Sequence, residues 1–535
     1  MTSFRSGGFS VRAGFAVLGG YFVLHLVLRS VVSDSMQIDE AEEVLLAQNW
    51  WWGYGSQPPL YTWLQKILFE VFGVNVFALA LLKNGLLFGT YLFTFLGARE
   101  ILRNGPHAIL ATFSLLLVPM LAWESQRDQT HLVLATMIAA ATLYVCVRLL
   151  QTRQAAYYLL LGLLFGAGVL AKYNYVFYCV ALLGALLTLA PFRSAVLNRK
   201  LLLTAGVILL VLAPHLYWVW THPDLTFSQS YKFQIQKAAG FSGTLMGTVK
   251  LLTGVAAFGA LLGLTYGLAC LRAPVVSPNQ ANSALVGLVI RTMLIGLGLC
   301  MAGIWLFHVS TIKGRWLQPL LIAWPIVLVA WAQPKLTPLA ARRILVLAGV
   351  VLVVVPAVMY GGVVAARWTG RQTNLNIPYD ALAGQVRSAG FNRGVIVAEG
   401  IRLGGNLKRN FPDSTVAVPG ILELPVLPDA PVLIAWHSGA NDAIPNTFVD
   451  YVARTCGVAL GALPAAKAVA PRGTTPISSG HSVMRCGHRR HRPRQRSDAG
   501  RPDACSVFGF GKLRSLGAPI GLWWIWSFSQ IGPSG

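Results

Sequence analysis

The sequence predicts a polytopic α-helical membrane protein with a small α/β domain near its C-terminus. Of its 535 residues, 55% are hydrophobic and only 12% are charged, and the mean hydropathy is +0.59. This composition is typical of chains with many membrane spans and excludes a single soluble domain. The net charge of +24 does not indicate a nucleic-acid partner, because most basic residues lie in short segments between apolar runs, where they set membrane orientation.

About eleven windows are apolar over the ~20 residues needed to cross the hydrocarbon core. They lie at residues 11–32, 75–97, 106–122, 130–149, 156–171, 174–191, 201–220, 246–270, 285–307, 316–333 and 343–366. If the N-terminus is cytoplasmic, the basic segments between windows fall on the inner side, as the positive-inside rule requires. We therefore expect a multi-pass protein of the plasma (inner) membrane with an uncleaved signal anchor and its C-terminal part outside.

The same topology gathers the conspicuous polar clusters at one membrane interface. It places on the outer side residues 33–74, 123–129, 172–173, 221–245 and 308–315, and everything after about residue 367. These segments are far apart in the chain, so the sequence predicts a site assembled from several outer loops.

The chain divides into three parts. Residues 1–368 form the predicted transmembrane domain, and 369–465 a predicted outer α/β domain. Short apolar, partly β-branched runs indicate buried strands in the second part, at 394–398, 414–418 and 431–436. Residues 466–535 carry eleven Lys or Arg against two Asp in a low-complexity context. Such a segment cannot bury a core, so we expect a disordered tail, or alternatively a non-native end.

Four carboxylates, at Asp39, Glu40, Glu42 and Glu43, follow the first predicted span. Ionised groups are costly near hydrocarbon and commonly mark function there. A carboxylate at the interface can act as a general base on an incoming hydroxyl, and we assign this role to Asp39. The alternative is structural, with Asp39 and Glu42 capping the start of a helix.

An aromatic cluster lies a few residues further on. It contains Trp50-Trp51-Trp52, Tyr54, Tyr61 and Trp63. The cluster is either the aromatic belt of a membrane protein or a platform on which a sugar ring or lipid stacks. Pro58-Pro59 lies between Tyr54 and Tyr61 and makes the chain there extended and rigid.

Residues 124–128 form the second outer loop. Asp128 is predicted to be a second carboxylate that faces Asp39 and helps to position an acceptor, a sugar or a divalent cation. The alternative is that Asp128 only caps the helix that follows. The seven cysteines show no metal-binding spacing, so a divalent cation at the carboxylates is the one cofactor left open.

Three cations, Lys172, Lys313 and Arg315, lie outside, contrary to the positive-inside trend. Phosphate binding requires cations of this kind. Alternatively, they are snorkelling charges at helix ends. We favour phosphate binding for Lys313 and Arg315.

Together these motifs resemble the bacterial branch of the dolichyl-phosphate-mannose protein mannosyltransferase family, glycosyltransferase family 39, and its aminoarabinose-transferase relatives. The resemblance spans about residues 10–460 and rests on the order and spacing of five motifs. These are Asp39-Glu40, Gly53-Tyr54 with Pro58-Pro59-Leu60, Arg127-Asp128, Ala171-Lys172-Tyr173, and Lys313-Gly314-Arg315-Trp316-Leu317-Gln318-Pro319.

The resemblance implies the GT-C fold and a transferase that moves a sugar from a polyprenyl-phosphate carrier to an acceptor on the outer side. The acceptor class, whether glycan, lipid or protein, stays open. Asp39 maps to the proposed base and Asp128 to the supporting carboxylate. The residues expected to bind substrate are Glu40, Tyr54, Pro59, Arg127, Lys172, Tyr173, Lys313 and Arg315. Two departures are Gln57, where the aminoarabinose enzymes have a lysine, and the missing proline of the Thr-Pro-Asp pattern before Asp128.

The expected reaction also follows from its chemistry. Displacing a lipid phosphate from an anomeric carbon needs a base at the acceptor and cations at the leaving phosphate, and a single displacement inverts the anomeric carbon. The chief alternative is a transporter or flippase of lipid-linked sugars, but the sequence shows no evident repeat and its charges cluster outside. A membrane scaffold with a sensory outer domain would leave the carboxylate pairs unexplained.

Overall fold

The computed structural model describes residues 10–226, 228, 241–271, 273–276, 278–371, 373–422 and 430–436. Beyond these it describes residues 448, 450–451 and 455 and three short strands. Most of the predicted outer loop 221–245 therefore lies outside the described residues, and so does most of the tail 466–535.

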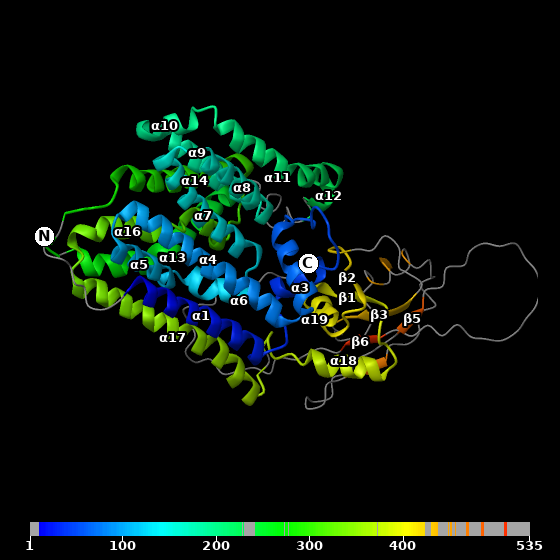
Figure 1. The fold of residues 1–535 in the computed structure, drawn as a ribbon. Coiled ribbons are helices and arrows are strands. Elements are labelled where there is room, and N and C mark those ends of the chain that lie inside the picture. The colour runs from blue at the N-terminus through cyan, green and yellow to red at the C-terminus, as the bar shows by residue number, and fades with distance from the viewer. Residues whose placement is uncertain are drawn as a thin grey trace, which may run out of the picture.

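Helices dominate the first 368 residues (Figure 1). The α-helices there are α1 (Val11–Val32), α2 (Ile38–Leu46), α3 (Leu60–Phe72), α4 (Val76–Leu102), α5 (Gly105–Phe113), α6 (Ser125–Asp128), α7 (His131–Thr152), α8 (Ala155–Ala171), α9 (Tyr175–Thr188), α10 (Ala190–Val196), α11 (Leu201–Thr221), α12 (Pro223–Thr226), α13 (Phe241–Cys270), α14 (Ser283–Phe307), α15 (Gln318–Leu321), α16 (Trp324–Ala332) and α17 (Pro338–Trp368). Short 3₁₀ segments at 114–117, 314–317 and 333–335 and a π-helical turn at 120–124 complete them.

Seven of the described helices are long and apolar enough to cross a membrane: α1, α4, α7, α11, α13, α14 and α17. Two bent pairs raise the number to nine if each is one span, with bends of 70° between 105–117 and 120–128 and of 58° between 314–321 and 324–335. The two other predicted windows are the shorter helices α8 and α9, so the structure supports seven to nine spans. The count of eleven stays a prediction that depends on α8 and α9 also crossing.

Prolines lie close to both bends. Pro119 precedes the π-helical turn of the first pair, and Pro325 opens α16 in the second. Proline lacks the amide hydrogen and clashes with the preceding turn, so it breaks a helix at such positions. The bends matter because the first pair ends at Asp128 and the second begins beside Arg315.

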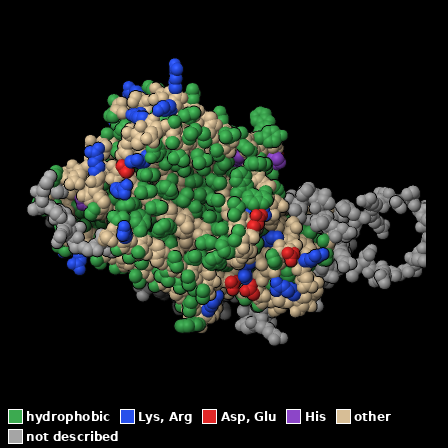
Figure 2. Space-filling view, in the orientation of Figure 1, with side chains coloured by type: hydrophobic (Ala, Val, Ile, Leu, Met, Phe, Trp, Pro, Cys, Tyr) green, Lys and Arg blue, Asp and Glu red, His purple; other side chains and the backbone are tan. Residues whose placement is uncertain are grey.

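The loops of the bundle gather into two sets at its two ends. At one end Lys200 donates to the carbonyl of Arg153, and Asn282 donates its amide to the carbonyl of Ile101. At the other end, α17 leads into the C-terminal domain, and α1 ends close to this domain (Figure 1). Figure 2 shows hydrophobic side chains covering the helical body between the ends, with charged side chains mostly outside this zone. The described loops lie at two ends, as the predicted division requires, but most of the loop 221–245 lies outside the described residues. Which set of loops faces the cytoplasm stays a prediction.

The C-terminal domain is α/β, as predicted. Its elements are α18 (Tyr379–Ser388), β1 (Val395–Ala398), α19 (Gly400–Asn410), β2 (Thr415–Ala417) and β3 (Pro431–Ala435). β1 pairs in parallel with both β2 and β3, and all four β1 side chains are buried, as the near-continuous apolar run of a parallel strand requires. All three predicted strands are therefore confirmed.

Three short strands are described within 466–535: β4 (Lys467–Val469), β5 (Val483–Arg485) and β6 (Phe508–Phe510). β5 joins the edge of the main sheet, antiparallel to β3, and gives the strand order β2-β1-β3-β5. The rest of the predicted tail lies outside the described residues.

Candidate active site

Helix α2 carries Asp39 and begins directly after the loop that follows α1. The carboxylate of Glu40 accepts the backbone amide of Gln37, 3.0 Å away, and so caps the helix start. Asp39 is the second helical residue, and its own amide donates to Asp128 Oδ1 at 3.2 Å. Neither alternative cap from the sequence is found: the cap of α2 is Gln37 rather than Asp39, and the cap position of α7 is Thr130 rather than Asp128.

The hydrogen bond between Asp128 and the amide of Asp39 brings together the two predicted carboxylates, which are 89 residues apart. Burial, followed by the nearby charges of Asp128 and Glu42, raises the pKa of Asp39 to about 7, although Arg315 and Lys172 act in the opposite direction. A carboxyl group with a pKa near neutrality is suited to accept a proton at working pH. Four predicted site residues, Asp39, Asp128, Lys172 and Arg315, are therefore close enough to interact.

Glu40 lies under the site and is almost wholly buried. Arg29 Nη2 is 2.6 Å from its Oε2, and Lys83 Nζ is 3.5 Å from its Oε1. Burial alone would raise the pKa of Glu40, but the charges of Arg29 and Lys83 outweigh it and lower the pKa to about 2. Glu40 thus stays ionised and ties α2 to α1 and α4, which leaves its carboxylate no free face for a substrate.

Glu43 makes a second buried anchor one helical turn further along α2. Its Oε1 lies 2.8 Å from His131 Nε2 at the start of α7, and its Oε2 accepts a hydrogen bond from Thr62 of α3 at 2.9 Å. Residues three apart share a helix face, so Glu40 and Glu43 both point into the bundle. Capping by Asp39 and Glu42 would leave the charge of Glu43 unexplained. Its contacts with His131 and Thr62 give this carboxylate a structural role.

Sequence reasoning did not identify Arg29, Lys83 or His131 as partners of these carboxylates. Arg29 lies near the end of the predicted window 11–32. Lys83 lies inside the window 75–97, and an ionisable residue within an apolar window is a signal that a buried partner exists. That signal could have pointed to Lys83, but nothing in the sequence says which carboxylate it pairs with.

Lys172 lies between α8 and α9 and faces the loop that follows α2. Its Nζ donates to Gln57 Oε1 at 3.0 Å. Gln57 is itself held by two backbone hydrogen bonds with Tyr54, each 3.1 Å long. The neighbouring Asn174 donates to the carbonyl of Trp316 at 3.0 Å. These contacts bring the Ala171-Lys172-Tyr173 and Lys313–Pro319 motifs together, as the topology predicted.

Three other predicted binding residues have structural contacts. The buried Tyr54 hydroxyl donates to the carbonyl of Asn49 at 2.7 Å. Pro59 is the N-cap residue of α3. Arg127 is exposed, and its Nη2 lies 2.9 Å from Glu124 of the same turn. Substrate binding by these residues stays a prediction.

Lys313 is exposed in the loop after α14, directly before the 3₁₀ turn that contains Arg315. Lys250 of α13, which sequence reasoning missed, donates to Thr311 Oγ1 in the same loop at 3.1 Å. Lys313, Arg315 and Lys250 therefore provide three cations on or against the segment 308–315. A phosphate group near this segment would find the cationic partners that it requires.

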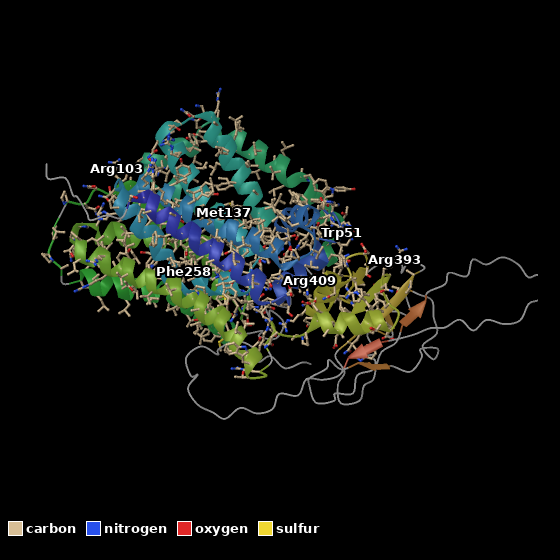
Figure 3. All side chains as sticks on the ribbon, turned by 60° about the horizontal axis from the view of Figure 1, so that its bottom comes forward. Trp51, Arg103, Met137, Phe258, Arg393 and Arg409 are labelled. Carbon is tan, nitrogen blue, oxygen red and sulfur yellow. The ribbon has the colours of Figure 1, made fainter. Side chains whose placement is uncertain are left out.

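The aromatic cluster lies at the same end of the bundle, where Figure 3 shows Trp51 near the C-terminal domain and Arg103 at the far end. Tyr173 stacks on His215 of α11 with ring centroids 5.7 Å apart. His215 Nδ1 is 2.6 Å from the carbonyl of Trp52. Trp50 and Trp52 remain about half exposed, at 51% and 54%, and both the belt and the platform hypotheses are compatible with this arrangement.

Among the residues that the structure describes, no group of three or more His, Cys, Asp or Glu side chains is placed to hold a metal ion. Asp39 and Asp128 offer two carboxylates with Glu42 close enough to interact, and Lys172 and Arg315 supply positive charge near Asp39. A divalent cation at the carboxylates stays a prediction.

The fold and the site together define a class of protein. A polytopic helical bundle is joined to a small α/β domain. At the end of the bundle next to this domain, the Asp39 carboxyl group, with a pKa of about 7, lies near Lys172 and Arg315. This combination fits a membrane glycosyltransferase that displaces a lipid phosphate, because it pairs a base with charge for the leaving group.

Comparison with known proteins supports this class. Residues 56–218 match the family model described as dolichyl-phosphate-mannose-protein mannosyltransferase. The chain is 34% identical over 461 residues to the lipopolysaccharide core galacturonosyltransferase RgtB of Rhizobium johnstonii, covering 83% of this chain and 91% of RgtB. It is 31% identical to RgtA of the same organism, with coverages of 84% and 92%. The crystal structure of ArnT from Cupriavidus metallidurans bound to undecaprenyl phosphate shares the fold, with a TM-score of 0.53 at 14% identity over 75% of this chain and 85% of ArnT.

The chain belongs to this family of GT-C membrane glycosyltransferases, of the dolichyl-phosphate-mannose-protein mannosyltransferase type, together with the rhizobial galacturonosyltransferases. It is a polyprenyl-phosphate-sugar-dependent glycosyltransferase. The transporter and scaffold alternatives are thereby set aside.

Proposed function

We propose that the protein transfers a galacturonic acid residue from a polyprenyl phosphate to a sugar hydroxyl of the lipopolysaccharide core, on the outer side of the inner membrane. The sugar and the acceptor are those named for the two relatives at 34% and 31% identity. The likeness to a structure that holds undecaprenyl phosphate supports a lipid of that kind as carrier. The observation that carries the mechanism is the meeting of Asp39, Asp128, Lys172 and Arg315 at one place.

In the proposed reaction the acceptor hydroxyl oxygen attacks the anomeric carbon of the donor sugar. The bond between that carbon and the phosphate oxygen breaks, and the hydroxyl proton passes to the Asp39 carboxylate. Polyprenyl phosphate leaves with the electron pair of the broken bond, and Arg315 and Lys172 stabilise its charge. One displacement inverts the anomeric configuration, which NMR of the product can assign.

Asp128 supports the base in two ways. Its carboxylate accepts the amide of Asp39 and so fixes the first turn of α2. Its negative charge is also the second-largest cause, after burial, of the raised pKa of Asp39. A stronger base accepts the hydroxyl proton more readily. Lys313 lies within the segment 308–315, and Lys250 contacts this segment through Thr311. Both lysines are proposed to bind phosphate there.

The direct test is Asp39→Asn in the purified full chain, assayed with polyprenyl-phosphate galacturonate and core lipopolysaccharide. We expect transfer to fall by about 10²–10⁴-fold, the usual contribution of a positioned general base. The matched control is Asp34→Asn, because Asp34 is an exposed aspartate on the neighbouring loop and should keep near-parental activity. Near-normal transfer by Asp39→Asn would show that the base is another group.

A further inference from the structure

The outer α/β domain touches the helix that carries Asp39. Gly405 of α19 lies against Ala41 of α2, and a Cβ atom added at Gly405 would be 2.5 Å from the Ala41 carbonyl oxygen and 2.7 Å from its Cα. No real Cβ atom tolerates such distances, so the two helices approach as closely as only glycine allows. Asn406, fully buried, accepts the amide of Met36 in the loop before α2 at 3.0 Å.

Further contacts hold the same surface together at both ends of α2. Gln48, just past the helix, exchanges two hydrogen bonds with the backbone of Val416 in β2, at 3.0 and 2.8 Å. Ser35, before the helix, donates to the carbonyl of Ile377 at 2.6 Å. The domain therefore contacts α2 and its flanking residues before the helix, in its middle and after its end.

The helix α2 needs external support because it has only nine residues. Isolated helices shorter than about 12–15 residues are marginal, so their position depends on packing. Glu40 and Glu43 anchor the face toward the bundle, whereas Ala41 lies against α19 on the side of the domain. Asp39 lies between the two sets of contacts, and its amide meets the carboxylate of Asp128 only while α2 keeps its place.

We propose that α19 of the outer domain is a positioning element for the active site, with Gly405 setting the distance at which α2 presents Asp39 to Asp128. The proposal rests on the proposed role of Asp39 as the base. It assigns the outer domain a part in the chemical step rather than only in acceptor binding. Gly405 acts through α2 and touches no substrate, so it is a positioning residue.

The test compares Gly405→Ala with Gly384→Ala in the full chain. Gly384 lies in α18 of the same domain, and a Cβ there would meet nothing within 4 Å. Gly405→Ala must push α2 aside, and a displacement of ~1 Å at a catalytic group can lower the rate about 100-fold. We expect a fall in kcat with little change in the KM for acceptor, and unchanged kinetics for Gly384→Ala.

The pH profile separates positioning from a merely structural role. If α2 moves away from Asp128, the repulsion that helps to raise the pKa of Asp39 weakens, and the midpoint of the rate profile moves from about 7 toward the ordinary value of 3.8. A protein that is only destabilised would instead give less folded enzyme with the parental midpoint and turnover per folded molecule, which would overturn the proposal.

Two further outcomes count against it. A raised acceptor KM with unchanged kcat and midpoint would mean that the domain only binds acceptor, and fully parental kinetics of Gly405→Ala would mean that α2 does not depend on the contact. If Gly405→Ala gives no folded protein, Asn406→Ala takes its place with the same criteria. Failure of the proposed function is seen separately, in the parental enzyme or in Asp39→Asn, before Gly405 is altered.

Discussion

Asp39 and Asp128 show how one partly buried contact between like charges can prepare a base. Carboxylates held close together cannot both ionise freely, so the pKa of one rises. Burial contributes most to the raised pKa of Asp39 and Asp128 contributes next. An active form that requires ionised Asp39 therefore gains population as the pH rises through about 7.

This predicts the effect of Asp128→Asn on pH dependence. The asparagine keeps an oxygen for the amide of Asp39 but removes the repelling charge, so the pKa of Asp39 falls. We expect the midpoint of the acidic limb of the kcat profile to lie near 7 in the parental enzyme, where the pKa of Asp39 is about 7, and at lower pH in Asp128→Asn. Asp34→Asn serves as the control and should leave the limb in place. An unmoved limb in Asp128→Asn would contradict the coupling of the two carboxylates.

At the scale of the element, helix α2 separates its carboxylates by role. Asp39 faces Asp128 at the helix start, while Glu40 binds the cations Arg29 and Lys83 inside the bundle and Glu43 contacts His131 and Thr62. Because the pKa of Glu40 is lowered to about 2, its ionised form stabilises the fold above its ordinary value of 4.5. That contribution is lost as the pH falls toward 2.

The buried anchor predicts a large stability effect. Glu40→Gln leaves Arg29 and Lys83 buried without their counter-charge, which typically costs about 3–5 kcal/mol. Glu70→Gln removes an exposed partner of Lys66, a pair of the kind worth about 0.3–0.5 kcal/mol. Thermal unfolding in detergent should therefore show a much lower Tm for Glu40→Gln than for Glu70→Gln. Equal Tm values would mean that Glu40 is not the anchor of α2.

At the scale of the whole molecule, the bundle brings distant loops to one end and attaches the α/β domain there (Figure 1). The positive-inside rule predicts that this end faces the outer side of the membrane. The seven to nine candidate spans are compatible with this orientation but do not select it.

Cysteine labelling tests the orientation. In a chain whose Cys456, Cys486 and Cys505 are replaced by serine, we expect Asp34→Cys to react with a membrane-impermeant maleimide in intact cells. Arg199→Cys, in the exposed turn before α11, should react only after the membrane is permeabilised. The reverse pattern would place Asp39 on the cytoplasmic side and would rule out transfer at the outer face.

The sequence by itself determined the apolar windows, the division of loops into two sets, the three strands and the pair of carboxylates, because each depends on local composition and spacing. Helix bends, caps and ion pairs needed the tertiary structure. The partners of Glu40 and Glu43 lie on four other helices, and no local pattern encodes which buried charges meet. The approach of Gly405 to Ala41, 364 residues away in sequence, likewise exists only once the C-terminal α/β domain packs against α2.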